Sequence, residues 1–343
     1  MPEKQKLSRR DLLVGGVAVA AAGFGAVAAV SSRVSSSRSL AIPKPSQVAI
    51  LRCESYRQSI YETVSQAVDL CRVPVAGKNI VLKPNLVEFE PNSVINTNPM
   101  VVHAALEAFR ARGAASVRIA EGPGHRRNTL DLADAAGYFE LIPGFEDLFT
   151  DLNLDDVKSV KLIQPKSKLK ALYLPHTVLG ADLLVSIPKL KTHHWVGATL
   201  SMKNLFGVVP GGVYGWPKNP LHWAGIPETI VDLHNIFPRQ FALVDGVVGM
   251  EGNGPIQGTP KTAGVIVAGN NMPAVDATCC RLMQIDPEKV SYLTGSTVPG
   301  EIAANNIRQI GETIDGNSTR FALIKDWQDL RLEPSSGVTG NRG

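Results

Sequence analysis

Residues 182–194 read DLLVSIPKLKTHH, and this stretch decides the fold class. Its first half, residues 182–187, is an almost continuous apolar run, which is typical of a strand covered by helices on both faces. Its second half, residues 188–194, places two lysines and two histidines directly after that strand. Such side chains are costly to place beside a buried strand without a ligand, so the stretch also predicts a binding site.

Five more segments share the strand character: residues 48–51, 79–82, 116–119, 241–244 and 264–268. Helical patterns lie between them, near residues 57–71, 99–112, 129–137, 227–236 and 273–284. This alternation predicts βαβ units, and hence an α/β protein with a mostly parallel sheet and flanking helices. We expect two lobes around a cleft, an N-terminal α/β lobe over residues 41–150 and a C-terminal one over residues 151–330, followed by a disordered tail over residues 331–343.

Residues 1–40 have the pattern of a targeting segment and linker. Ser8-Arg9-Arg10 precedes an uncharged apolar run over residues 12–30, and this order resembles the twin-arginine export consensus. The run either ends at a small-x-small cleavage site, residues 26–28, or stays as an anchor just long enough to span a bilayer. We therefore expect an exported protein, periplasmic or anchored at the outer face of the membrane, with the twin-arginine translocation machinery as a partner. Membrane contact is expected only through an uncleaved leader.

Composition narrows the partners. The 35 basic and 31 acidic residues give a net charge of +4 and are spread through the chain, so no basic stripe indicates nucleic acid. A small anionic molecule is the expected ligand. The four cysteines lack Cys-x-x-Cys spacing, which excludes a zinc ribbon and a ferredoxin module, and Cys279 and Cys280 are expected in the core. Phosphate-loop, dinucleotide-binding and serine-hydrolase motifs are absent from the sequence.

Polar side chains follow several predicted strands at the ends where ligands bind in parallel sheets. Their cations are suited to a carboxylate or phosphate. The candidates are Lys83 and Asn85 after the second strand, His125 and Arg126 after the third, and Lys189, Lys191 and His193 after the fourth.

Asp245 and Glu251 bracket a glycine-rich loop after the fifth strand. Their carboxylates are hard oxygen ligands and predict a divalent cation site. The alternative is that the glycines of this loop serve only a close backbone approach.

Four segments together resemble the domain of unknown function 362 family: SIPKLKTH at 186–193, TLSMKNLFG at 199–207, Asp245-Gly246 with GNGP at 252–255, and AVDA at 274–277. The resemblance covers roughly residues 48–295. It implies a fold more than a reaction, and it adds Lys203 and Asn204 to the candidate cofactor contacts. Many relatives also carry a cysteine-rich cluster-binding module, which this sequence lacks.

A more distant resemblance is to the nickel-pincer lactate racemase family. Gly124-His125-Arg126, then His193 ten residues before Lys203, and then His222 are similar in order to that family's pattern. The resemblance implies His125 and His193 as acid and base, Lys203 as the covalent holder of a pincer-type nucleotide, and His222 as a metal ligand. The setting of Lys203 departs from the family, since it lies in Ser-Met-Lys-Asn and not in a glycine-rich segment.

The leading hypothesis is an exported enzyme, dependent on a cofactor or metal, that acts on a small anionic substrate as a racemase or epimerase. The alternatives are a non-catalytic periplasmic anion-binding protein and a redox accessory protein, and the missing cysteine cluster weakens the latter. Each site residue also has a structural alternative: Lys203 as a surface lysine, His222 packed between aromatic rings, and His125 on a surface loop. Convergence of His125, His193, Lys203 and His222 on one cavity favours the enzyme.

Overall fold

The computed structural model describes residues 45–57, 59–295 and 301–333. The predicted leader, residues 1–40, and most of the predicted tail lie outside the described residues. All of the described residues belong to one compact unit. None of the helices in the described ranges is both long enough and apolar enough to cross a membrane.

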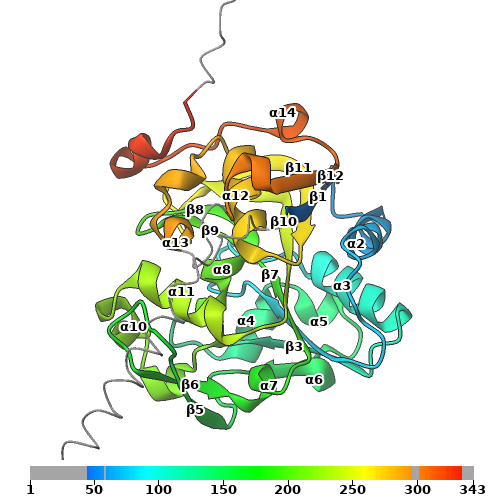
Figure 1. Ribbon diagram of the computed structural model, residues 1–343. Helices are drawn as coiled ribbons and strands as arrows, with labels where there is room; N and C mark the ends of the chain where they lie inside the picture. The colour runs from blue at the N-terminus through cyan, green and yellow to red at the C-terminus, as the bar shows by residue number, and fades with distance from the viewer. Residues whose placement is uncertain (1–44, 58, 296–300, 334–343) are drawn as a thin grey trace, which may run out of the picture. The chain divides into compact units, whose positions relative to one another are not determined.

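A ten-stranded sheet forms the centre of the described part, and its main path runs β12-β1-β11-β10-β7-β2-β3-β4 (Figure 1). The bounds are β1 (Ser46–Arg52), β2 (Asn79–Pro84), β3 (Ser116–Glu121), β4 (Phe149–Asp151), β7 (Leu183–Ile187), β10 (Gln240–Glu251), β11 (Thr259–Gly269) and β12 (Ile307–Gly311). Two more strands join beside β10: β8 (Lys189–His193) and β9 (Gly197–Thr199). Most pairs are parallel, so the predicted α/β class with a mostly parallel sheet is confirmed.

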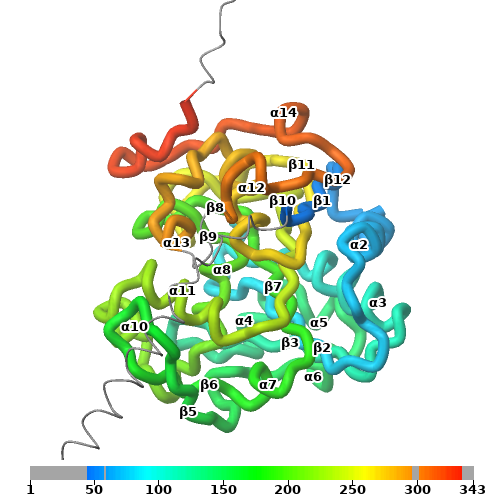
Figure 2. Tube along the Cα trace, viewed as in Figure 1, coloured from blue at the N-terminus to red at the C-terminus, as the bar shows by residue number. Residues whose placement is uncertain are grey.

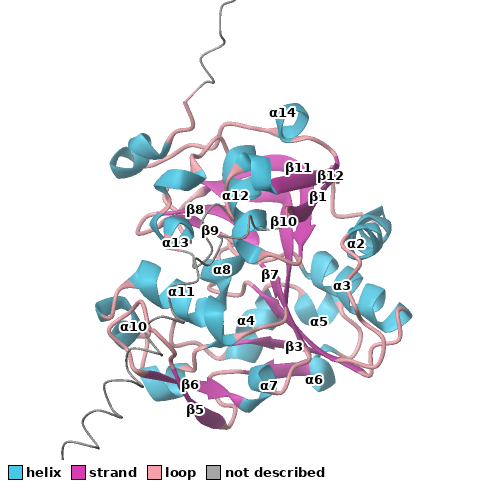
Figure 3. Cartoon of the chain, viewed as in Figure 1, coloured by secondary structure: helices cyan, strands magenta, loops and turns pink. Residues whose placement is uncertain are grey.

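Helices cover both faces of the sheet (Figure 3). Val48 and Ile50 of β1 pack into one core with α8 (Ser201–Asn204), α11 (Ile226–Ile236) and α12 (Met272–Leu282). Ala49 and Leu51 pack into the other core with α2 (Ser59–Leu70), α3 (Pro99–Ala111) and α4 (Thr129–Ala135). Since successive strand residues point to opposite faces, the continuous apolar runs are explained by burial on both sides.

Shorter elements complete the fold. A two-stranded antiparallel sheet, β5 (Val157–Lys161) and β6 (Ala171–Pro175), is separate from the main one. The short helices are α5 (Tyr138–Leu141), α6 (Phe145–Leu148), α7 (His176–Leu179), α9 (Gly211–Tyr214), α10 (Asn219–Trp223), α13 (Ser291–Thr294) and α14 (Ile314–Asn317). Single turns of 3-10 helix cover residues 205–208, 287–289, 304–306 and 325–330.

Strands that are distant in sequence pair at one edge of the sheet. Figure 2 shows the blue first strand, β1, beside the yellow β11 and the orange β12. β11 runs antiparallel to both of its neighbours, β1 and β10. The sheet therefore takes strands from both halves that we predicted as lobes, residues 41–150 and 151–330.

Residues 188–194, which we did not predict as a strand, are mostly strand β8. The strand pairs with β10, where Lys189 lies opposite Asp245, and all five of its residues are buried. The segment contains Lys189 and Lys191, and lysine is rarely fully buried. The structure buries them because each has partners in neighbouring segments.

Candidate functional site

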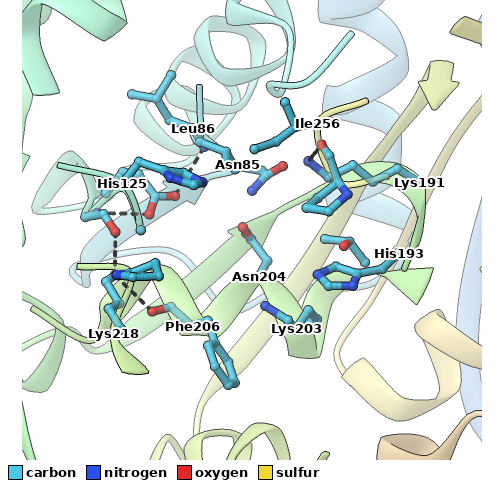
Figure 4. A pocket seen from close by; sticks show the side chains of 18 of the residues that line it. Asn85, Leu86, His125, Lys191, His193, Lys203, Asn204, Phe206, Lys218 and Ile256 are labelled. Carbon is cyan, nitrogen blue, oxygen red and sulfur yellow. Dashed lines mark hydrogen bonds between the residues drawn. The ribbon is translucent and has the colours of Figure 1, made fainter. Parts of the chain in front are cut away.

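A cavity of about 330 Å³ lies at the carboxyl ends of β2 and β3, closed on its other sides by β8, β9 and α8 (Figure 4). This is the end of a parallel sheet where ligands commonly bind. The predicted residues that line it are Lys83, Asn85, His125, Lys191, His193, Lys203, Asn204 and His222. Four side chains from separate segments, His125, His193, Lys203 and His222, thus meet at one cavity.

Lys83 lies at the end of β2 and is fully buried. Its ammonium forms an ion pair with Glu121 and also donates to the Pro84 carbonyl (3.0 Å) and to Asn204 Oδ1 (3.1 Å). All three N–H groups of Lys83 are therefore used within the protein. Burial lowers the pKa of Lys83, and the Glu121 carboxylate opposes that shift.

Asn204 ties this pair to the rest of the sheet. Its Nδ2 donates to the Lys83 carbonyl and to Ser186 Oγ, both at 3.0 Å. Asn204 and Lys83, predicted as cofactor contacts, thus form the wall of the cavity together with Glu121.

Lys191 and Lys218 are buried lysines that have backbone partners in place of carboxylates. Lys191 Nζ donates to the carbonyls of Ile95 (2.9 Å) and Pro255 (3.2 Å). Lys218 Nζ donates to the carbonyls of Gly122 (2.6 Å) and Phe206 (3.3 Å). Burial lowers the pKa of Lys191 well below its usual range and that of Lys218 to about 7.

Lys203 differs from the other three lysines of the cavity in its hydrogen bonding. Among the described residues its Nζ has no hydrogen-bond acceptor, and it lies 4.0 Å from the centre of the Phe206 ring. Burial, and secondarily the nearby Lys83, lower its pKa to about 8. Since only the neutral amine is nucleophilic, Lys203 is better suited to covalent chemistry than an ordinary lysine.

Asp276 of α12 fixes the helix turn that carries Lys203. Its fully buried carboxylate accepts hydrogen bonds from Ser201 N (2.8 Å), Met202 N (2.9 Å) and the Ser201 hydroxyl. These are the free donors at the start of α8. Burial raises the pKa of Asp276 to about 7, although its three donors oppose the shift.

Two histidines lie close to Lys203. His193 is 4% exposed, and its Nδ1 accepts a hydrogen bond from Trp195 N (3.0 Å), which leaves the proton of the neutral ring on Nε2. His222 lies against the rings of Trp195 and Phe206. Burial lowers the pKa of both rings, well below 6.5 for His193, and Lys203 is the largest charged contributor for each.

The other two histidines of the cavity, His194 and His125, differ in hydrogen bonding and exposure. His194 Nδ1 is hydrogen-bonded to the Gly254 carbonyl (2.7 Å), and its ring also lines an adjoining hollow of about 510 Å³ with Trp195, Pro255 and Ile256. His125 is exposed and lies on the opposite side of the cavity from His193 (Figure 4). The cavity thus has an imidazole on each of two facing walls.

Two buried polar atoms in the cavity wall have no partner. They are Asn85 Oδ1 and Thr199 Oγ1, in side chains that are 7% and 4% exposed. Buried polar groups are normally hydrogen-bonded, so each is a candidate contact for a ligand.

Lys189, Asp245, Glu251 and Arg126 lie outside the cavity. Lys189 Nζ contacts Asp245 Oδ2 at 2.5 Å and Tyr56 Oη at 2.9 Å. Lys189 and Asp245 therefore neutralise each other. The roles in cofactor and metal binding stay predictions for these two residues.

Glu251 also has protein partners. It accepts from Ala322 N (2.7 Å) and lies 3.6 Å from Lys261 Nζ. Arg126 lines a separate hollow with Arg127 and Trp216. Within the described ranges no group of three or more His, Cys, Asp or Glu side chains could hold a metal ion. The divalent site at Asp245 and Glu251 stays a prediction.

Glu121, Thr199 and Lys218 are polar residues of the cavity that had no role in the sequence-based prediction. Glu121 ends β3, so its position at a strand end was the available signal. Lys218 follows Trp216-Pro217 and has a positive φ of 67°, uncommon for a residue other than glycine, and nothing in its local pattern indicates burial.

The solved structures that resemble this chain are distant. The lactate racemase apoprotein from Thermoanaerobacterium thermosaccharolyticum aligns with 71% of this chain and 58% of its own, at 16% identity and a TM-score of 0.44. A protein from Thermotoga maritima aligns with 67% of this chain and 59% of its own, at 13% identity and a TM-score of 0.37. The chain thus spans less than two thirds of either structure.

Among curated proteins, Thylakoid-associated protein sll1697 from Synechocystis sp. is 25% identical over 254 residues, which are 71% of this chain and 76% of the relative. The family model described as Domain of unknown function (DUF362) matches residues 80–281, more than half of the chain. This range contains the cavity-forming strands β2, β3, β8 and β9 together with α8 and α12, and the chain belongs to the DUF362 family.

Proposed function

We propose that the chain is a cofactor-dependent enzyme that acts on a small anionic substrate in the cavity, as a racemase or epimerase of hydroxy acids. The observation that carries the proposal is Lys203: a partly buried amine without a protein acceptor among the described residues, in the same cavity as two imidazoles with lowered pKa values. Strongly shifted groups that meet in one cavity are characteristic of catalytic sites.

His125 and His193 are the proposed acid and base. Interconversion of two enantiomers requires a group on each face of the reacting carbon that takes or returns the hydroxyl proton. The two imidazoles lie on opposite sides of the cavity (Figure 4). Because burial keeps His193 neutral at physiological pH, it would begin as the base, and the exposed His125 can exchange protons with solvent.

Lys203 is the proposed attachment point for an organic cofactor that bears a carbonyl group. A pincer-type nucleotide would supply hydride-accepting chemistry and its own donor atoms for a metal. The residues fit such a group: Lys203 offers the amine, His222 one imidazole, and Asn85 and Thr199 unpartnered polar atoms. The adjoining hollow, which shares His194 and Trp195 with the cavity, offers room for a second molecule.

The covalent step can be tested by intact-mass and metal analysis of the protein purified from its own source. We expect an added mass on the Lys203 peptide, lost in Lys203→Arg, and a metal that leaves with the adduct. An unmodified chain without metal would overturn the cofactor part of the proposal.

The acid–base step requires a separate experiment with a matched control. Interconversion of short 2-hydroxy acids, followed by chiral chromatography, is expected to fall about 10²- to 10⁴-fold in His125→Gln and in His193→Gln. His176→Gln, an exposed histidine outside the cavity, is the control and should retain full activity. If the two cavity variants match the control while ligand binding persists, the chain is a non-catalytic anion-binding protein, the alternative that its lysine-rich wall favours.

A further inference from the structure

The balance of charge in the cavity limits what its ligand can be. Four lysines line it, and Glu121 is the only carboxylate among its lining residues in the described ranges. Glu121 is already paired with Lys83. Lys191, Lys203 and Lys218 therefore have no acidic partner in the cavity wall.

Lys191 and Lys218 share an uncommon arrangement. Each is at least 98% buried, and each donates to two backbone carbonyls. An ammonium group has three N–H donors, so one remains on each lysine for a ligand in the cavity that both line. Lys83, in contrast, has protein acceptors for all three.

The two ammonium groups are on opposite sides of the cavity. In Figure 4, Asn85 and Asn204 lie between Lys191 and Lys218. Because the two ammonium groups lie on opposite sides, we infer that each requires an anionic group of its own. A buried charge without a counter-ion is costly, so both ends of the cavity favour an anion.

Two side chains of the cavity wall, Asn85 and Thr199, offer further polar contacts to a ligand. Asn85 Oδ1 and Thr199 Oγ1 are buried atoms of the cavity wall that have no hydrogen-bond partner within the described part of the chain. A hydroxyl group on the ligand would satisfy such atoms, whereas a plain hydrocarbon chain would leave them unpaired.

We propose that the ligand carries two anionic groups, one bound by Lys191 and the other by Lys218, with a hydroxyl-bearing segment between them. Short dicarboxylates and phosphorylated hydroxy acids have this chemistry. This inference concerns the same cavity as the proposed function and rests on that function in no other respect. Burial lowers the pKa values of Lys191 and Lys218. Because a bound anion favours the charged form of each lysine, binding at neutral pH should take up protons from solution.

Calorimetry with matched probes tests the proposal without turnover. Malate is compared with 3-hydroxybutyrate, and 3-phosphoglycerate with glycerate, so that the two arms distinguish a second carboxylate from a phosphate. At least one dianion should bind about tenfold to a hundredfold more tightly than its monoanion, the gain typical of one charged hydrogen bond. Repeating the titration in buffers of different ionisation enthalpy should reveal proton uptake with that dianion.

The lysine variants assign the two ends. Lys191→Met and Lys218→Met should each reduce the affinity for the dianion to about the affinity for the monoanion. Lys158→Met, which changes an exposed lysine on β5, should leave both affinities unchanged. Lys218→Gln keeps a donor for the Gly122 and Phe206 carbonyls without the charge, so it separates loss of charge from misfolding. Thermal unfolding of each variant checks the fold.

Three results would overturn the proposal. They are equal affinity for dianion and monoanion, a dianion preference that survives in both lysine variants, and no binding of either dianion up to the millimolar range. The proposed enzymatic function fails by a different result, the absence of a Lys203 adduct or of histidine-dependent interconversion, so the two failures are distinguishable.

Discussion

At the scale of single residues, Lys203 differs from its neighbours because its amine has no acceptor among the described residues. Its pKa is lowered to about 8, so deprotonation occurs at lower pH than for an exposed lysine. The neutral amine is the reactive form. Lys203 is therefore the cavity lysine that we expect to react with a ligand of modest size.

The pH dependence of acylation tests this. With a small, limiting acylating reagent, the rate of modification at Lys203 should rise with pH and reach half of its maximum near pH 8. Peptide mass spectrometry over a pH series measures the rate, and exposed Lys158 reports reagent access in the same sample. A half-maximum at the pH of an ordinary lysine would show that Lys203 is solvated and lacks the proposed role.

At the scale of elements, the start of α8 depends on Asp276 of α12. Its pKa is about 7 in the folded chain, above its ordinary 3.8, so the folded state binds the proton more tightly than the unfolded state does. The contribution of a group with a raised pKa is largest at low pH and declines as pH rises from about 4 to about 7. We expect Asp276→Asn to lower the free energy of unfolding more at pH 5 than at pH 8.

Urea denaturation of the unsubstituted chain and of Asp276→Asn at pH 5 and pH 8 measures the difference in unfolding free energy. Asp315→Asn, which removes a carboxylate from the short surface helix α14, is the control and should show little change at either pH. A destabilisation by Asp276→Asn that increases with pH would contradict the assignment.

The turn after α8 carries a second structural requirement. A methyl group at Gly207 would overlap the carboxylate of Glu121 and the ammonium of Lys83. Gly207→Ala should therefore cost about 1–3 kcal/mol of unfolding free energy, as for other overpacked sites, and distort the cavity. Gly124→Ala is a matched control, since its added methyl group meets no atom within 4 Å and should change stability by at most about 0.5 kcal/mol. Equal stability of the two variants in thermal unfolding would show that the side chains of Glu121 and Lys83 can shift to accommodate the added methyl group.

At the scale of the whole molecule, the sequence predicts the sheet better than the cavity. The strands β2 and β7 are largely apolar runs buried on both faces, a local property that a sequence displays directly. β8 was missed because the charges of Lys189 and Lys191 are compensated by Asp245 and by the carbonyls of Ile95 and Pro255, which are distant in sequence. Compensation between distant segments depends on the tertiary fold.

The same physical reason separates the two groups of predicted site residues. His125, His193, Lys203 and His222 all line the cavity, the arrangement that favours the enzyme hypothesis. Asp245 and Lys189 also follow strands, but they pair with each other. A position after a strand therefore predicts closeness to the sheet edge, and only the partner of each charge decides whether it is available to a ligand.

The last prediction concerns the leader, whose residues lie outside the described part. We propose that Ser8-Arg9-Arg10 and the apolar run after it direct export of the folded chain by the twin-arginine route. A route that carries folded proteins suits an enzyme that acquires its cofactor before leaving the cytoplasm. With residues 1–40 fused to a reporter that fluoresces only when folded before export, we expect periplasmic fluorescence, and its loss when both Arg9 and Arg10 are changed to Lys. Arg33→Lys, beyond the apolar run, should leave export intact, and export that survives the double change would exclude this route.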